Sequence, residues 1–236
     1  MSNPTKLNFG SRATIVCTIA CAIAALTAIG LLTASRLRAE PEPDIQKILK
    51  GVEDRYNRIQ TLEVKFTEKS AIQGRTRTEE GELYLRKPGR MRWQYTQPAG
   101  KLFVSDGKFI YLYTPSDHRY QRMPLKETED MRAPLAFLLG RIHFNDDFRE
   151  FTTLPDPDGD HLFITAIPKS DKLPYTEVTF LVSPDSSVIH WLRVVNQDGS
   201  REEFVFEHEQ KNLPLRDGLF KFAPPPGAEF VDSAHP

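Results

Sequence analysis

The sequence predicts a mostly β protein: an antiparallel meander of strands interrupted by two short helices. Apolar and polar residues alternate in run after run, and half-buried strands produce this period of two. The runs are separated by pairs such as Gln73-Gly74, Asp106-Gly107 and Asp198-Gly199, which favour hairpin turns. Two segments show helical spacing instead, one before the first strand and one between the strands.

The N-terminal segment sets the expected compartment. Residues 13–34 carry no charge and follow the basic residues Lys6 and Arg12, as in an export signal or a membrane anchor. Their length also suffices to span a bilayer. We therefore expect residues 1–39 to be a signal peptide, with cleavage favoured, or an N-terminal membrane anchor, and residues 40–236 to form one domain outside the cytoplasm.

The first helix is expected from Asp44, an N-cap residue, to about Ile59. Apolar residues recur within it at spacings of three, four and seven and so share one face: Ile45, Ile48, Leu49, Val52, Tyr56 and Ile59. Two interpretations remain open at this point. The helix either caps one end of a sheet or lies as a lid over an apolar cavity.

The stretch 81–95 predicts two antiparallel strands joined at Pro88-Gly89. Met91, Trp93 and Tyr95 alternate with polar residues and therefore share one face of the second strand. These side chains are large, adaptable or amphipathic, so they suit either an ordinary core or an irregular apolar surface. Later runs such as 109–113 and 162–164 are apolar on both faces, which predicts that both sides of the sheet are covered.

The second helix is expected within residues 132–140. Pro134 suits a first helical position and Gly140 a C-terminal stop. Leu135, Leu138 and Leu139 fall on one face. The segment is thus a second lid candidate.

Charge and motifs exclude several functions. The first 39 residues hold four basic and no acidic side chains, so the remainder has a formal charge of −5, which argues against nucleic acid as a partner. Both cysteines lie within residues 13–34. The sequence has no nucleophile elbow, phosphate loop or zinc motif, and its histidines are scattered, each expected in an isolated role. We expect no catalytic residue, metal site or cofactor.

Two sequence blocks carry a resemblance to a known family. The run GELYLRKPGRMRWQYTQPAGKLFVSDGKFIYLY and the later FKFAPPPGAEFV, which begins at Phe220, resemble the outer-membrane lipoprotein carrier family, LolA, in motif and order. The similarity covers roughly residues 44–232. It implies an incomplete, half-open antiparallel β-barrel covered by short helices.

The resemblance also implies a function and a set of sites. A LolA-like protein is a periplasmic chaperone, expected as a monomer, that carries acylated lipoproteins from an inner-membrane ABC lipoprotein-releasing transporter to an outer-membrane receptor lipoprotein. The acyl cavity and its lid would include Met91, Trp93, Tyr95, Leu135, Leu138 and Leu139. Lys87 stands where the family has an arginine that latches the lid, so it would form a weaker or differently wired latch.

Two other functions compete with the carrier. Related half-barrels sense mislocalised lipoproteins at the inner membrane, and retention of residues 13–34 would favour such a membrane-tethered sensing module. A lipid-acting enzyme is disfavoured because the sequence offers no nucleophile.

Overall fold

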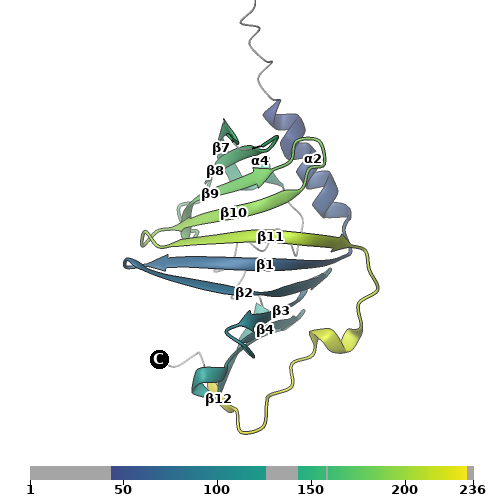
Figure 1. Ribbon diagram of the computed structural model, residues 1–236, viewed down its shortest axis with the longest axis vertical. Helices are drawn as coiled ribbons and strands as arrows, with labels where there is room; N and C mark the ends of the chain where they lie inside the picture. Colours follow the sequence, from purple (N-terminus) through teal and green to yellow (C-terminus); the bar gives the residue numbers. More distant parts are fainter. Residues whose placement is uncertain (1–43, 126–142, 158, 233–236) are drawn as a thin grey trace, which may run out of the picture. The chain divides into compact units, whose positions relative to one another are not determined.

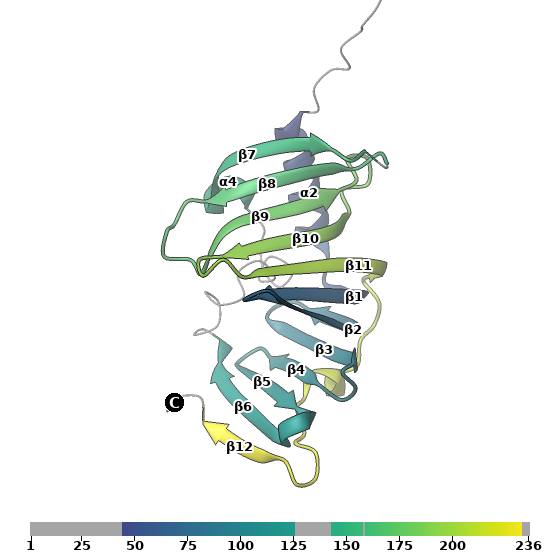
Figure 2. The same ribbon diagram turned by 60° about the vertical axis from the view of Figure 1, so that its left-hand side comes forward.

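A single sheet of twelve strands dominates the computed structural model, which describes residues 44–125, 143–157 and 159–232 (Figures 1 and 2). Its spatial order is β12-β6-β5-β4-β3-β2-β1-β11-β10-β9-β8-β7. The strands are β1 (Thr61–Ile72), β2 (Arg75–Arg86), β3 (Arg90–Gln97), β4 (Leu102–Asp106), β5 (Phe109–Thr114), β6 (Arg119–Pro124), β7 (Phe148–Pro155), β8 (Leu162–Pro168), β9 (Tyr175–Val182), β10 (Ile189–Asn196), β11 (Arg201–Lys211) and β12 (Glu229–Asp232).

The predicted mostly β, antiparallel fold is confirmed as an open sheet whose edges are β12 and β7. Hairpins join most neighbours, and β1 pairs with β11 to link the two halves of the chain. One pairing departs from the prediction, because β12 adds to β6 in parallel. The C-terminal segment reaches that edge by a long connection after β11 (yellow in Figure 1), and such a crossover permits parallel pairing.

Helix α2 (Ile45–Arg58) agrees with the first predicted helix. Asp44 caps it, since its carboxylate accepts a hydrogen bond from the Lys47 backbone N–H at 3.2 Å. Its buried stripe, Ile48, Leu49, Val52 and Tyr56, packs into the main hydrophobic core. Helix α4 (Phe144–Asp147) is a single turn that contributes Phe144 to the same core.

The main core covers one face of the sheet, which we call the inner face. Strand alternation places Phe66, Trp93 and Phe204 on it, together with Leu83 and Ile164. Because α2 packs against this core, it covers part of the inner face.

The C-terminal segment lies on the opposite, outer face. Arg86 pairs with Asp217, and the Arg92 guanidinium donates to the Leu219 carbonyl at 3.2 Å. Phe220 is 1% exposed, and Phe222 stacks on Tyr111 with ring centroids 5.0 Å apart. This packing confirms that both faces of β5 are covered.

Some sequence predictions fall on residues that the structure does not describe. The expected signal or anchor, 1–39, is one such segment, and the lid helix with Leu135, Leu138 and Leu139 is another.

Candidate functional site

A cavity of about 610 Å³ opens on the inner face of the sheet. Strands β1, β3, β5, β9, β10 and β11 supply its walls, together with the turns 197–198 and 98–101. The lining residues are Glu68, Trp93, Tyr95, Lys101, Leu112, Pro174, Tyr175, Val194, Asn196, Gln197, Asp198, Glu202 and Phe204. Its volume falls in the range of cavities that hold small ligands.

Aromatic rings supply much of the apolar lining of this cavity, and Phe66 packs against them without lining it. Phe66 meets Trp93 edge to face at 4.7 Å between centroids and Tyr95 at 5.2 Å, while Trp93 meets Phe204 at 5.9 Å. Alternation on β1, β3 and β11 brings these rings to one face, so three strands far apart in sequence build the cluster. Trp93 and Tyr95, predicted to be cavity residues, therefore line a cavity together.

A charged wall faces these rings. The Lys101 ammonium pairs with Glu79 and lies 4.1 Å from the centroid of the Tyr95 ring. The Tyr95 hydroxyl donates to Glu68 at 3.1 Å, and Glu68 lies directly opposite Glu79 across the β1–β2 ladder. Burial, reinforced by the Glu79 charge, raises the pKa of Glu68, against the lowering effects of Lys101 and Tyr95.

The sequence prediction did not include this wall, although β1 carries a signal for it. Leu62, Val64 and Phe66 point to the inner face, and the same period of two carries Glu68 there as well. A carboxylate in the apolar phase of a strand is uncommon, and it marks the place where the cavity lining changes from apolar to polar. The sequence carries no comparable signal for Lys101, because this residue lies in the loop before β4, where side chains do not follow the alternation of a strand.

Comparisons with known proteins identify the family to which the chain belongs. A family model described as outer membrane lipoprotein carrier protein LolA matches residues 57–223. The chain belongs to this family. The outer-membrane lipoprotein carrier protein of Edwardsiella ictaluri (strain 93-146) is 26% identical over 212 residues, which cover 89% of this chain and 96% of the relative.

Two further comparisons agree with this family assignment, one in sequence and the other in fold. The outer-membrane lipoprotein carrier protein of Salmonella typhi is 26% identical over 184 residues, 77% of this chain and 86% of that protein. A crystal structure of an uncharacterized conserved protein from Thermus thermophilus superposes with a TM-score of 0.50 at 11% identity, over 80% of this chain and 99% of the other. The structural likeness shows the fold alone.

Lys87, the predicted latch of this LolA family member, contacts α2. Its ammonium donates to the Tyr56 carbonyl at 2.6 Å, and burial lowers the pKa of Lys87. The Tyr56 carbonyl is one of the four at a helix C-terminus that lack an intrahelical partner. Lys87 thus caps α2, the first of the two lid candidates, whereas its contact with the 132–140 segment stays a prediction.

A second set of bonds holds the same turn of α2. The Tyr56 hydroxyl donates to Glu209 at 3.0 Å and accepts from the Ile189 backbone N–H at 3.0 Å. Glu209 is also paired with Arg55. The C-terminal turn of α2 is therefore fixed to the turn after β2 and to β10 and β11 together.

Met91 occupies a different place from Trp93 and Tyr95. It is buried in the main core, where its sulfur accepts from the Trp93 indole N–H at 3.3 Å, and it is not part of the cavity lining. The register pairs Met91 with Leu85 on β2, two residues before Lys87 and hence toward the α2 end of the inner face. A cavity-mouth role for Met91 stays a prediction.

The histidines are less isolated than the sequence suggested. The rings of His161 and His190 lie 4.7 Å apart, His190 bonds the Ser183 hydroxyl at 2.8 Å, and His161 lies 3.5 Å from Asp156. Burial, together with the His161 charge, lowers the pKa of His190. Within residues 44–125, 143–157 and 159–232, however, no three His, Cys, Asp or Glu side chains form a group that could hold a metal ion. Nor is any helix in these ranges long and apolar enough to cross a membrane.

Proposed function

We propose that this protein is a periplasmic carrier that shields the acyl chains of lipoproteins in the inner-face cavity. One observation supports this most strongly: in a member of the LolA family, Trp93 and Tyr95 on β3 and Phe204 on β11 line a single cavity of about 610 Å³. The protein acts as a monomer and uses no cofactor.

The energetics of an acyl chain explain why such a cavity is needed. Each buried methylene gains about 0.8 kcal/mol, so ten methylenes left in water cost on the order of 8 kcal/mol. An acylated protein cannot cross an aqueous space at that cost without a cover. The edge-to-face rings around Trp93 offer apolar surface, and they do not form a fixed mould for one chain shape.

The charged wall suits release as much as binding. Glu68, Lys101 and Glu202 occupy lining that an all-apolar cavity would use to bury more methylenes. The affinity for an acyl chain is correspondingly lower. The polar wall can face the ester, amide and peptide groups that link the acyl chains to the rest of the lipoprotein. In this proposal the cargo is loaded by the inner-membrane ABC transporter and passed to a receptor lipoprotein at the outer membrane.

Release of lipoproteins from membranes tests this function. Spheroplasts that contain a labelled outer-membrane lipoprotein are incubated with the purified protein, and the label in the soluble fraction is measured. We expect soluble label to co-elute with the protein. A cargo variant whose lipidated cysteine is replaced by serine serves as the control and should not co-elute. If the protein is folded by circular dichroism and releases no label, the carrier proposal fails.

A further inference from the structure

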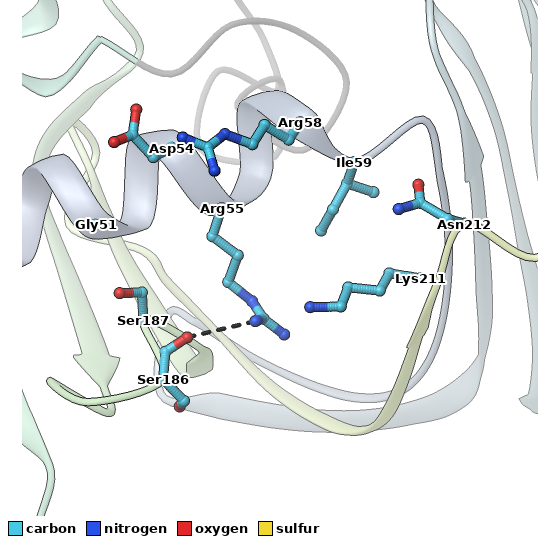
Figure 3. Close-up of a pocket in the computed structure, with 9 residues that line it drawn as sticks. All are labelled: Gly51, Asp54, Arg55, Arg58, Ile59, Ser186, Ser187, Lys211 and Asn212. Carbon is cyan, nitrogen blue, oxygen red and sulfur yellow. Dashed lines mark hydrogen bonds between the residues drawn. The ribbon is translucent and has the colours of Figure 1, made fainter.

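A second pocket lies outside the acyl cavity and shares no lining residue with it. Its volume is about 330 Å³, and its walls are the C-terminal half of α2, the turn between β9 and β10, and the end of β11. Figure 3 shows Arg55 entering it from the helix, and Lys211 entering from the opposite wall with its ammonium directed toward the Arg55 guanidinium; Arg58, also in the lining, runs along the helix with its guanidinium toward Asp54.

The charges of this pocket are unbalanced. Its one acidic lining residue, Asp54, accepts a hydrogen bond from Lys50 at 2.8 Å along the helix. The Arg58 charge also acts on Asp54, whereas Lys211 forms no ion pair among the described residues. Cations held near one another in a partly enclosed space repel, and an anion between them would remove that cost.

Arg55 supplies a fixed donor group to the same pocket. Its guanidinium donates to the Ser186 carbonyl at 3.3 Å and pairs with Glu209, so its position is set from two sides. Its Nε is buried and has no hydrogen-bond partner within the part of the chain that the structure describes. Buried N–H groups are nearly always bonded, so the guanidinium retains donor capacity.

The opposite wall is built rigidly. The Ser187 backbone N–H donates to the Ser183 carbonyl at 2.8 Å, and the Ser183 N–H donates to the Val188 carbonyl at 3.0 Å. The turn approaches α2 so closely that a Cβ at Gly51 would lie 2.5 Å from the Ser187 hydroxyl oxygen. Glycine at 51 therefore lets the turn and the helix meet, which preorganises the pocket and lowers the entropy cost of binding.

We propose that this pocket binds a phosphate group, either in a free phosphate compound or in a lipid headgroup. The Lys211 ammonium and the unpartnered Nε–H of Arg55 face the same space, and a guanidinium with an ammonium gives the charge-assisted bonds that phosphate oxygens accept. The volume exceeds that of a single carboxylate and leaves room for the ester substituent. This site is independent of acyl binding, so either proposal can fail without the other.

The pocket also touches the bonds that hold α2. Arg55 shares Glu209 with Tyr56, whose carbonyl accepts from Lys87. A phosphate that draws on the Arg55 guanidinium competes with Glu209 for it. Binding is therefore expected to perturb the amide signals of the last turn of α2 as well as those of the pocket.

Nuclear magnetic resonance titrations of the isotope-labelled protein test the proposal at constant ionic strength. Inorganic phosphate and glycerol 3-phosphate are added in turn, with chloride as the reference anion. We expect saturable shifts of the Gly51, Ser186 and Ser187 amide signals. The double variant Arg58→Gln/Lys211→Gln should bind at least tenfold more weakly, and Lys172→Gln, which removes an exposed lysine elsewhere, should bind like the parent.

A flotation arm separates the two sources of phosphate. The ligand is a lipid headgroup if phosphatidylglycerol vesicles retain the parent protein but not the double variant, and if phosphatidylcholine vesicles retain neither protein. The ligand is a free phosphate compound if soluble phosphates shift the amide signals saturably and the vesicles retain the parent protein and the double variant equally. The proposal is overturned if the three amides do not shift saturably in the unaltered protein, or if the double variant binds as tightly as the parent in both arms.

Discussion

Replacing Lys87 by methionine tests how α2 is held over the inner face. Methionine keeps the length and apolar stem of lysine but cannot donate, so the Tyr56 carbonyl at the helix end loses its partner at 2.6 Å. A hydrogen bond from a charged donor contributes about 1.5–3 kcal/mol. Part of this loss is offset in the methionine variant. Burial of the charged ammonium is unfavourable, which also lowers the pKa of Lys87, and methionine carries no charge to bury. We expect a net loss of about 1–2 kcal/mol in the free energy of unfolding.

Two measurements follow that loss. Urea denaturation gives the change in free energy, and hydrogen exchange of residues 52–59 shows whether α2 opens locally. Lys172→Met is the matched control, since that lysine is exposed in the loop before β9. Lys87→Arg, which restores a donor, should return exchange to the parent level and slow ligand release. Unchanged stability and unchanged exchange of α2 in Lys87→Met would refute the assignment of Lys87 as the cap of this helix.

Three further substitutions probe the two faces of the sheet. Met91→Glu places a carboxylate in the buried core, so we expect a loss of several kcal/mol in urea denaturation; a stable protein that lost only acyl binding would instead locate residue 91 at the cavity mouth. Phe220→Ala should cost about 3–5 kcal/mol, yet leave the acyl affinity of the remaining folded protein unchanged, because Phe220 packs on the outer face. Loss of acyl affinity there would contradict the separation of the faces. Glu68→Gln should stabilise the fold at pH 7. It should have no such effect below pH 4.5, the ordinary pKa of a glutamate side chain, because Glu68 is then protonated in both the folded and the unfolded state. The pKa of Glu68 is raised, so its ionisation penalises the native state only as the pH rises toward and above the raised pKa, and equal effects at both pH values would exclude that penalty.

The local pattern was sufficient to predict α2, most strands and the shared face of Trp93 and Tyr95, but β6, β7, β12 and α4 were not predicted. The Asp44 cap and the apolar stripe located α2 to within a residue, and alternation put Trp93 and Tyr95 on the face that lines the cavity. Both signals are encoded by neighbouring residues, since capping and periodicity act over a few positions. The motifs around Lys87 then suggested the family that the comparisons confirmed.

What the sequence did not predict depends on partners far away in the chain. The charged wall needs Lys101 to meet Glu79, and the parallel β12 needs the chain after Lys211 to cross the outer face to β6. Lys87 likewise finds its acceptor 31 residues earlier, on Tyr56. A single sequence carries no pairing information at such separations, so only a structure could identify these contacts.

The two tryptophans allow a direct test of acyl binding in the proposed cavity. Trp93 lines it, whereas Trp191 packs edge to face on Phe163 at 5.9 Å, on the opposite face of the sheet. Titration with a fatty acid brominated along its chain quenches indole fluorescence only at close range. In Trp191→Phe, where Trp93 is the remaining indole, we predict saturable quenching, and in Trp93→Phe almost none. Equal quenching of the two variants, or quenching of Trp191 alone, would contradict acyl binding on the inner face.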